Sequence, residues 1–267
     1  MPGNNEKMIV KSTTLPADSI ILDLEDSVPF DSKEGARDLI CRMLASLDWG
    51  TRELCVRING LSTPFGKQDI EALGKVQTLD CFVVPKSEAD LSWLHSETGK
   101  GLIPLIETAK GLSSIMGIAS SNGAVALSYG AGDLAASLGG AFTAYLDNPY
   151  VMTQIVVAAR SCGIDPIDDV FFDVQNIKEF QRQAENAKSL GFVGKQVVHP
   201  TQVEVANKVF STSEAELLKA KRIVEAYEES KSKGKGAFKL NGELVDEVHY
   251  RAAKAALKGS PKHQDNP

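Results

Sequence analysis

Short apolar runs alternate with helix-like segments along most of this chain, and this alternation limits the folds open to it. The clearest example lies in residues 101–139, where Leu102–Ile106 and Ala124–Tyr129 are both strand-like. Each run ends in a small polar turn that carries one carboxylate, Glu107 or Asp133, and helix-like sequence follows both. Strand-like runs that recur at intervals of roughly 25–35 residues indicate repeated strand–helix units and therefore a parallel sheet.

Seven strands are predicted in this way: Ser19–Leu24, Leu54–Ile58, Cys81–Val84, Leu102–Ile106, Ala124–Tyr129, Val170–Val174 and Lys195–Val198. A closed eight-stranded ring needs one more strand, and the only place for it is before Pro2. We therefore predict an α/β fold, a (β/α)₈ TIM barrel with a truncated first strand. The alternative is an open doubly wound sheet, but no GxGxxG motif follows the first strand.

The composition changes after Ser230, where a basic, glycine-rich stretch leads into a short helical pattern. We expect residues 1–230 to form the barrel and catalytic domain. Residues 231–258 are predicted to form a linker and a C-terminal lid helix, and residues 259–267 a disordered tail.

Overall charge and composition exclude several classes of function. The formal net charge of −6 argues against a nucleic-acid partner, which usually requires a clustered basic face. No apolar run approaches membrane-spanning length and the first residues lack a signal-peptide core, so we expect a cytoplasmic protein without a membrane partner. The four cysteines show no zinc-like spacing and are interpreted as buried free thiols.

An ionisable residue ends every predicted strand. In chain order these residues are Glu25 and Asp26, Arg57, Lys86, Glu107, Asp133, Asp173 and His199. Each has an ordinary structural explanation by itself, as a helix cap or a solvated loop residue. Because catalytic groups of a parallel barrel collect at the carboxyl ends of its strands, the set as a whole predicts a site there.

The residue types in this set indicate a particular chemistry. Two or three carboxylates without a histidine cluster suit Mg²⁺, with Mn²⁺ as the alternative cation, better than zinc. The Arg57 guanidinium matches a substrate carboxylate. A hard cation beside a bound 2-oxo or 2-hydroxy acid suits the making or breaking of a carbon–carbon bond through an enolate. No nucleophile elbow, P-loop or dinucleotide motif is present.

Several motifs in this order resemble the citrate lyase β-subunit (CitE-like) family of the HpcH/HpaI aldolase superfamily. They are PGN, ILDLEDSV, VRIN, VPK, LIPLIETAKG, GAGDLAASLG, GKQVVHP and GAFKLNGELVD, and they span nearly the whole chain. The family includes malyl-CoA and citramalyl-CoA lyases. It normally carries a short apolar strand with an arginine before PGN, whereas this sequence begins at Met1-Pro2, and Gly132 stands where many relatives carry an acid.

The resemblance implies a Mg²⁺ site with Glu107 and Asp133 as the metal ligands. It implies that Arg57 binds the carboxylate of the oxo acid and that Glu25 and Asp26 order water and supporting hydrogen bonds.

Further residues follow from the same analogy. Lys86 and the backbone amides of Gly130, Ala131 and Gly132 would hold the substrate, and Asp246 would lie on a lid over a neighbouring subunit's site as general acid/base. Basic residues for the CoA phosphates have weaker support, and the candidates are Lys11, Lys33 and Arg37.

The implied activity is a Mg²⁺-dependent retro-Claisen cleavage of a 3-hydroxyacyl-CoA thioester, with citryl-, malyl- and citramalyl-CoA all open. The implied partners are the acyl-CoA, a small oxo acid, further copies of the chain in a homotrimer and the other subunits of a citrate lyase complex. Two other functions remain open: a pyruvate-type aldolase acting on free acids, and a non-catalytic CoA-ester-binding homologue. The sequence leaves the physiological direction undetermined.

Overall fold

The computed structural model describes residues 1–232, 238–240 and 243–258. The chain divides into two compact units, Met1–Lys208 and the part from Val209 onward. No helix among the described residues has both the length and the apolar character needed to cross a membrane.

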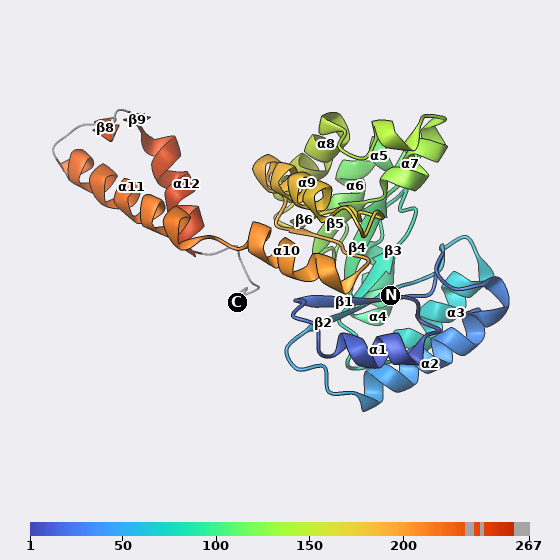
Figure 1. Ribbon diagram of the computed structural model, residues 1–267. Coiled ribbons are helices and arrows are strands. Elements are labelled where there is room, and N and C mark those ends of the chain that lie inside the picture. Colours follow the sequence, from blue (N-terminus) through green and yellow to red (C-terminus); the bar gives the residue numbers. More distant parts are fainter. Residues whose placement is uncertain (233–237, 241–242, 259–267) are drawn as a thin grey trace. The chain divides into compact units, whose positions relative to one another are not determined.

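The first unit is built on a curled, all-parallel sheet of seven strands in chain order (Figure 1). The strands are β1 Ser19–Asp23, β2 Glu53–Arg57, β3 Cys81–Val84, β4 Gly101–Ile106, β5 Ala126–Tyr129, β6 Asp165–Asp168 and β7 Gly194–Lys195. Each strand pairs in parallel with the next, as repeated strand–helix units require. The α/β class and the parallel sheet predicted from the sequence are confirmed.

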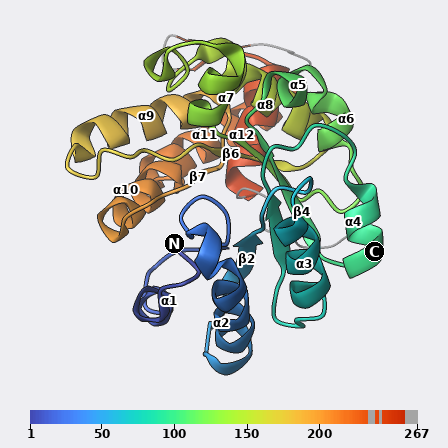
Figure 2. The ribbon, with the colours of Figure 1, turned by 90° about the vertical axis from the view of Figure 1, so that its right-hand side faces the viewer.

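The helices of this unit lie around the outer side of the sheet (Figure 2). They are α1 Glu6–Ser12, α2 Lys33–Ser46, α3 Pro64–Leu73, α4 Ser92–Thr98, α5 Ala109–Ser113, α6 Ile115–Ala119, α7 Ala131–Leu138, α8 Pro149–Ser161, α9 Ile177–Leu190 and α10 Pro200–Phe210, with 3₁₀ turns η1 Phe30–Ser32 and η2 Phe142–Ala144. Side-chain caps fix the residues at which several of these helices begin. Thr63 Oγ1 accepts the Gly66 amide before α3, and Asn176 Oδ1 accepts the Glu179 amide before α9.

The sheet has an outer and an inner apolar layer because successive strand residues point to opposite faces. Leu22, Val56 and Phe82 belong to the layer that packs with helix residues such as Ile40 and Leu73. The opposite face carries a second layer, which contains Cys55, Cys81, Val83, Ile103, Leu105 and Ala126. In β1 the same alternation turns Asp23 away from the helices.

The first three residues form a remnant of one more strand beside β1. Pro2 makes an isolated parallel bridge with Asp23. The Asp23 amide donates to Met1 O at 2.9 Å, and the Gly3 amide donates to Asp23 O at 2.8 Å. A Cβ on Gly3 would lie 2.6 Å from Asp23 O, so glycine is required there. Among the described residues no strand pairing joins β7 to this segment, and the closed eight-stranded barrel stays a prediction.

The predicted strand at Val170–Val174 is wrong, because β6 lies earlier, at Asp165–Asp168. The apolar run VFFDV has strand-like composition, but it forms a loop in which Phe171 packs on Phe180 of α9, with ring centroids 6.1 Å apart. Asp173 therefore does not end a strand. The predicted strand Lys195–Val198 is likewise displaced, since β7 is Gly194–Lys195, and His199 precedes α10 instead of ending a strand.

The second unit contains α11 Glu214–Ser232, the antiparallel hairpin β8 Phe238–Leu240 with β9 Glu243–Val245, and α12 Glu247–Lys258. Tyr227 of α11 stacks on Tyr250 of α12 with ring centroids 4.5 Å apart. The hairpin lies in the stretch interpreted from sequence as a linker. The tail at 259–267, predicted to be disordered, lies outside the described residues.

A buried ion pair joins α2 to α3 in the first unit. Arg37 Nε donates to Asp69 Oδ1 at 2.7 Å, and Asp69 Oδ2 accepts both the amide and the side chain of Asn59, which follows β2. We expect Asp69→Ala to lower the free energy of unfolding by about 3–5 kcal/mol, because it leaves the buried Arg37 charge without its counter-charge. Urea unfolding followed by tryptophan fluorescence measures this, since both tryptophans lie in this unit.

The matched control is Lys67→Ala on the same helix. Lys67 is largely exposed and pairs with Glu71 only at 3.9 Å, so its loss should change the free energy of unfolding by less than about 0.5 kcal/mol. Equal effects of the two substitutions would show that the Arg37–Asp69 pair does not stabilise the fold.

Candidate active site

An ion pair between β1 and β2 marks the carboxyl edge of the sheet. Arg57 donates through Nε and Nη2 to the two carboxylate oxygens of Asp23, at 2.6 and 2.8 Å. Burial alone would raise the pKa of Asp23, but Arg57 and a hydrogen bond from Ser27 outweigh it and lower that pKa to about 2. Asp23 therefore binds two guanidinium donors of Arg57, the residue predicted from the sequence to bind a substrate carboxylate. The third nitrogen, Nη1, lies on the side of the guanidinium that faces away from Asp23.

Glu25 lies in the same cluster and carries a carboxylate oxygen without a donor. Its Oε1 accepts Lys86 Nζ at 2.8 Å, and its Oε2 lies 3.2 Å from Arg57 Nη1. Oε2 is buried and receives no hydrogen bond. Burial raises the pKa of Glu25 despite the charges of Arg57 and Lys86. The neighbouring Asp26 is exposed.

A strained backbone turn after β3 holds Glu107. Lys86 has a φ of 48°, which is rare for a residue with a Cβ, and its amide donates to Glu107 Oε1 at 2.7 Å. On the other side of the carboxylate is Gly130, where a Cβ would lie 2.6 Å from Glu107 Oε2. A glycine is therefore needed at 130 so that the carboxylate can lie against the backbone.

Negative charge is concentrated around Glu107. Its pKa is raised to about 7 by burial first, then by Glu25 and by Asp133. Asp133 lies exposed in the first turn of α7. The two carboxylates predicted as metal ligands thus follow neighbouring strands, and the charge of Asp133 helps to raise the pKa of Glu107. A bound cation would relieve this repulsion.

The start of α7, from Gly130 to Asp133, offers fewer backbone donors than the sequence suggested. The Gly130 amide donates to Ile106 O at 3.2 Å, and the Ala131 amide donates to Asp169 Oδ2 at 2.7 Å. The amides of Gly132 and Asp133 lie in the first turn of α7, where no helical carbonyl accepts them. The amides of Gly130 and Ala131 are therefore already hydrogen-bonded, whereas those of Gly132 and Asp133 are not used by the helix.

The sequence did not reveal the buried hydrogen-bond network next to the start of α7. Lys195 donates to Asp168 Oδ2 and to the carbonyl of Asp169, each at 2.6 Å, and Tyr129 donates to Asp168 Oδ1 at 2.9 Å. Burial raises the pKa of Asp169 to about 6. The sequence signal for this network was the acid pair Asp168-Asp169 in DPIDDV. The apolar run after it was predicted as the strand instead.

Four other residues singled out in the sequence do not contribute side chains to this cluster. Asp173 is in an exposed loop, and His199 is exposed and hydrogen-bonded to Thr201 Oγ1 at 2.9 Å. Arg37 is buried against Asp69, so it is not free for a CoA phosphate. Lys33 donates to the carbonyls of Leu24 and Glu25, both at 2.8 Å.

Asp246 lies in the second unit, directly before α12. Its carboxylate accepts the Val248 amide at 3.0 Å and lies 2.7 Å from His249 Nδ1. The hydrogen bond from His249 lowers the pKa of Asp246. The side chain is 44% exposed.

Comparisons with known proteins show what this chain is similar to. A sequence profile of the family described as HpcH/HpaI aldolase/citrate lyase matches residues 1–200. The citrate lyase subunit beta of Leuconostoc mesenteroides subsp. cremoris is 34% identical over 276 residues, covering 97% of this chain and 90% of that protein. A (3S)-malyl-CoA thioesterase of Cereibacter sphaeroides is 34% identical over 269 residues, covering 96% and 91%.

A solved structure is similar to this chain over nearly its whole length. The protein CitE from Mycobacterium tuberculosis, in complex with magnesium, acetoacetate and coenzyme A, superposes with a TM-score of 0.82 at 30% identity. The superposition covers 97% of this chain and 95% of that one.

The crowding of carboxylates predicts how stability depends on pH in metal-free protein. Because the pKa of Glu107 is raised from 4.5 to about 7, the folded protein retains a proton between these values that the unfolded chain has lost. The stability that this proton contributes is fully present below the unfolded pKa and is lost as the pH rises to about 7. We therefore expect the free energy of unfolding to fall by up to about 3 kcal/mol across this window because of Glu107.

Glu107→Gln tests this by urea unfolding in a chelator, because glutamine keeps the acceptor for Lys86 but cannot ionise. The variant should be more stable than wild type at about pH 8 and nearly equal to it at about pH 5. Glu71→Gln, a change on α3, should show no such difference. A pH profile unchanged by Glu107→Gln would contradict the raised pKa.

Proposed function

Because this chain belongs to the HpcH/HpaI aldolase/citrate lyase family and is a lyase, we propose that it cleaves a 3-hydroxyacyl-CoA thioester into acetyl-CoA and an oxo acid in a Mg²⁺-dependent reaction. The observation that carries the proposal is the position of Glu107. Its carboxylate is crowded by Glu25 and Asp133 on a sheet edge that also presents Arg57 and Lys86. A cation site therefore adjoins an anion site, as a chelated hydroxy acid requires.

The donors present suit Mg²⁺. Glu107 and Asp133 are hard oxygen ligands, and Mg²⁺ commonly takes only one or two carboxylates and leaves its other positions to water and substrate oxygens. Bound Mg²⁺ would act as a Lewis acid on the substrate hydroxyl and carboxylate oxygens. Similarity to a CitE solved with magnesium supports the same assignment.

The remaining residues bind and orient the substrate. Arg57 presents Nη1 to the substrate carboxylate, while Asp23 holds its other two donor groups in place. The amides of Gly132 and Asp133 are the donors for a substrate oxygen. Glu25 Oε2, which lacks a donor, accepts a hydrogen bond from an ordered water or the substrate hydroxyl, and the exposed Asp26 supports that water.

The chemistry is a retro-Claisen cleavage. The substrate hydroxyl gives its proton to the Asp246 carboxylate, which acts first as a general base. The hydroxyl oxygen becomes the carbonyl of the oxo acid, and the electrons of the broken carbon–carbon bond form the enolate of acetyl-CoA. Asp246, or a bound water, then returns a proton to the enolate carbon. Run in reverse, the same residues carry out a condensation.

We further propose that Asp246 reaches the site of a neighbouring subunit in a homotrimer, on a lid formed by the second unit. The proposal includes a closed eight-stranded barrel with the Met1–Gly3 segment as its short first strand. Free thiols at all four cysteines fit the reducing cytoplasm. Citryl-, malyl- and citramalyl-CoA remain the candidate substrates, and other citrate lyase subunits the candidate partners.

Hydrolysis of the thioester is the second candidate, and similarity to a (3S)-malyl-CoA thioesterase favours it. The two reactions differ in their products, since cleavage yields an oxo acid and acetyl-CoA whereas hydrolysis yields a hydroxy acid and free CoA. A panel of the three thioesters, assayed separately for oxo acid and for free thiol, distinguishes them. Release of thiol without oxo acid would overturn the lyase proposal.

Removal of either proposed metal ligand should weaken Mg²⁺ binding and lower turnover. We expect Glu107→Gln and Asp133→Asn each to weaken Mg²⁺ binding at least about tenfold, because each removes one charged oxygen donor. Isothermal titration calorimetry measures the affinity, with Glu71→Gln as an unaffected control. Full turnover after exhaustive chelation would contradict the proposed site.

Replacement of the proposed acid should separate catalysis from binding. Asp246→Ala should lower kcat by roughly 10²–10⁴-fold and leave Mg²⁺ affinity unchanged, since a general acid contributes on this scale and does not touch the metal. Glu247→Ala, at the adjacent exposed position, is the matched control.

Mixed oligomers test whether sites are shared between subunits. Arg57→Ala and Asp246→Ala proteins should each be inactive alone and should regain part of the activity when unfolded and refolded together. Wild-type turnover by Asp246→Ala would remove this residue from the mechanism, and an inactive mixture would place both residues in one subunit's site.

A further inference from the structure

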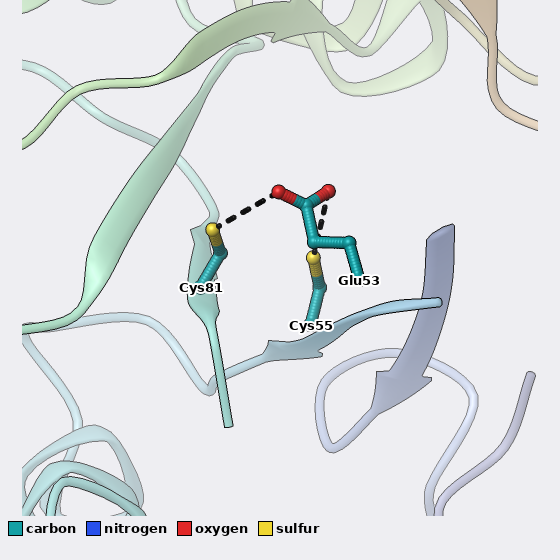
Figure 3. A group of neighbouring side chains, drawn as sticks. All are labelled: Glu53, Cys55 and Cys81. Atoms are coloured by element: carbon teal, nitrogen blue, oxygen red, sulfur yellow. Dashed lines mark hydrogen bonds between the residues drawn. The ribbon is translucent and has the colours of Figure 1, made fainter. Parts of the chain in front are cut away.

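Two cysteines and a glutamate meet at the end of the sheet opposite the site described above. Glu53 is the first residue of β2 and Cys81 the first residue of β3, and Cys55 lies directly across from Cys81 in the parallel register. Figure 3 shows the carboxylate of Glu53 turned toward both sulfur atoms. Arg57, at the other end of β2, belongs to the candidate active site.

The spacing of the three side chains matches a metal site. Glu53 Oε1 lies 3.6 Å from Cys81 Sγ, and Oε2 lies 3.8 Å from Cys55 Sγ. Tetrahedral zinc, with bonds of about 2.3 Å to sulfur and about 2.0 Å to oxygen, places such ligand atoms about 3.5 Å apart. Among the described residues, this is the one group of three His, Cys, Asp or Glu ligand atoms that all lie within 4.8 Å of one another.

The charge of Glu53 gives a second reason to expect a cation. Its carboxylate is half-buried, and within the described part of the chain no Lys, Arg or His lies within ion-pair distance of it. Its side-chain partners are the two thiols, which are weak hydrogen-bond donors. Such a carboxylate would normally be paired, because burial without a counter-charge is costly.

The surroundings hold the sulfur atoms in place. Cys55 and Cys81 are 0% and 3% exposed, within the inner apolar layer. A Cβ on Gly101 would lie 2.6 Å from Cys81 Sγ, so glycine is needed beside the thiol. Ser19 Oγ of β1 lies 3.4 Å from Cys55 Sγ, close enough to offer a fourth oxygen.

We propose that Glu53, Cys55 and Cys81 bind a thiophilic divalent cation of the zinc class, with Ser19 or a water in the fourth position. Two sulfurs and one oxygen favour zinc over Mg²⁺, so this site and the proposed Mg²⁺ site select different ions. The bound cation would tie β1, β2 and β3 together at their amino ends. The site is independent of the proposed lyase reaction.

Cobalt is the probe, because cobalt bound by thiolates has a near-ultraviolet charge-transfer band. The full-length chain, reduced and freed of metal, should bind one equivalent of Co²⁺ with this band, and Zn²⁺ but not excess Mg²⁺ should displace it. Cys55→Ser and Cys81→Ser should each abolish or strongly weaken the band. Glu53→Gln should lower Co²⁺ affinity at least about tenfold.

The other two cysteines provide the control. Cys41→Ser and Cys162→Ser should bind Co²⁺ as wild type does, and circular dichroism should show that every variant is folded. Absence of the band from wild type, its persistence in a Cys55→Ser/Cys81→Ser double variant, or unchanged affinity in Glu53→Gln would overturn the proposal. So would a Cys55–Cys81 disulfide, detected by mass spectrometry in protein purified without oxidant.

Discussion

Asp23 connects the sheet to the candidate active site through both its backbone and its side chain. Its backbone holds the Met1–Gly3 segment beside β1, and its carboxylate binds Arg57 at 2.6 and 2.8 Å. The same carboxylate accepts the amides of Glu25 and Ser27, which shapes the turn after β1. A buried charge with this many donors fixes one geometry, because any partner that is removed leaves the rest uncompensated. Placement of Arg57 therefore depends on the first strand of the sheet as much as on β2.

Within the site, the positive and negative charges do not balance one another. Arg57 and Lys86 carry positive charge beside Glu25, while Glu107 and Asp133 repel each other and burial opposes ionisation of Glu107. A fold selected only for stability would avoid a buried carboxylate whose pKa is raised to about 7. The strained turn at Lys86 and the glycine at 130 both serve to hold this carboxylate. Unfavourable electrostatics concentrated at one sheet edge is expected where a ligand supplies the missing charge.

The sequence predicted the class of fold, six of the seven strands to within a few residues, and the pair Glu107 and Asp133, because apolar runs followed by polar turns report strand ends directly. It missed Asp23, which lies inside the predicted strand Ser19–Leu24 and is distinguished only by the face of the sheet that it occupies. It misplaced β6, because DPID is less apolar than the loop VFFDV that follows it. The pairing of Cys55 with Cys81 depends on strand register, which spacing along the chain does not reveal.

One face of β2 carries both the Cys55 thiol and the Arg57 guanidinium, and their positions along the strand keep the two groups apart. Cys55 and Arg57 are two residues apart, about 7 Å along an extended strand, and point to the same side of the sheet. Val83, Ile103 and Leu105 belong to the same inner apolar layer as Cys55. Soft sulfur ligands at the amino end therefore do not compete for the hard cation proposed at the carboxyl end. A cation held by Cys55 would also restrain the strand that presents Arg57, so the two ends of β2 are mechanically linked although their chemistry is separate.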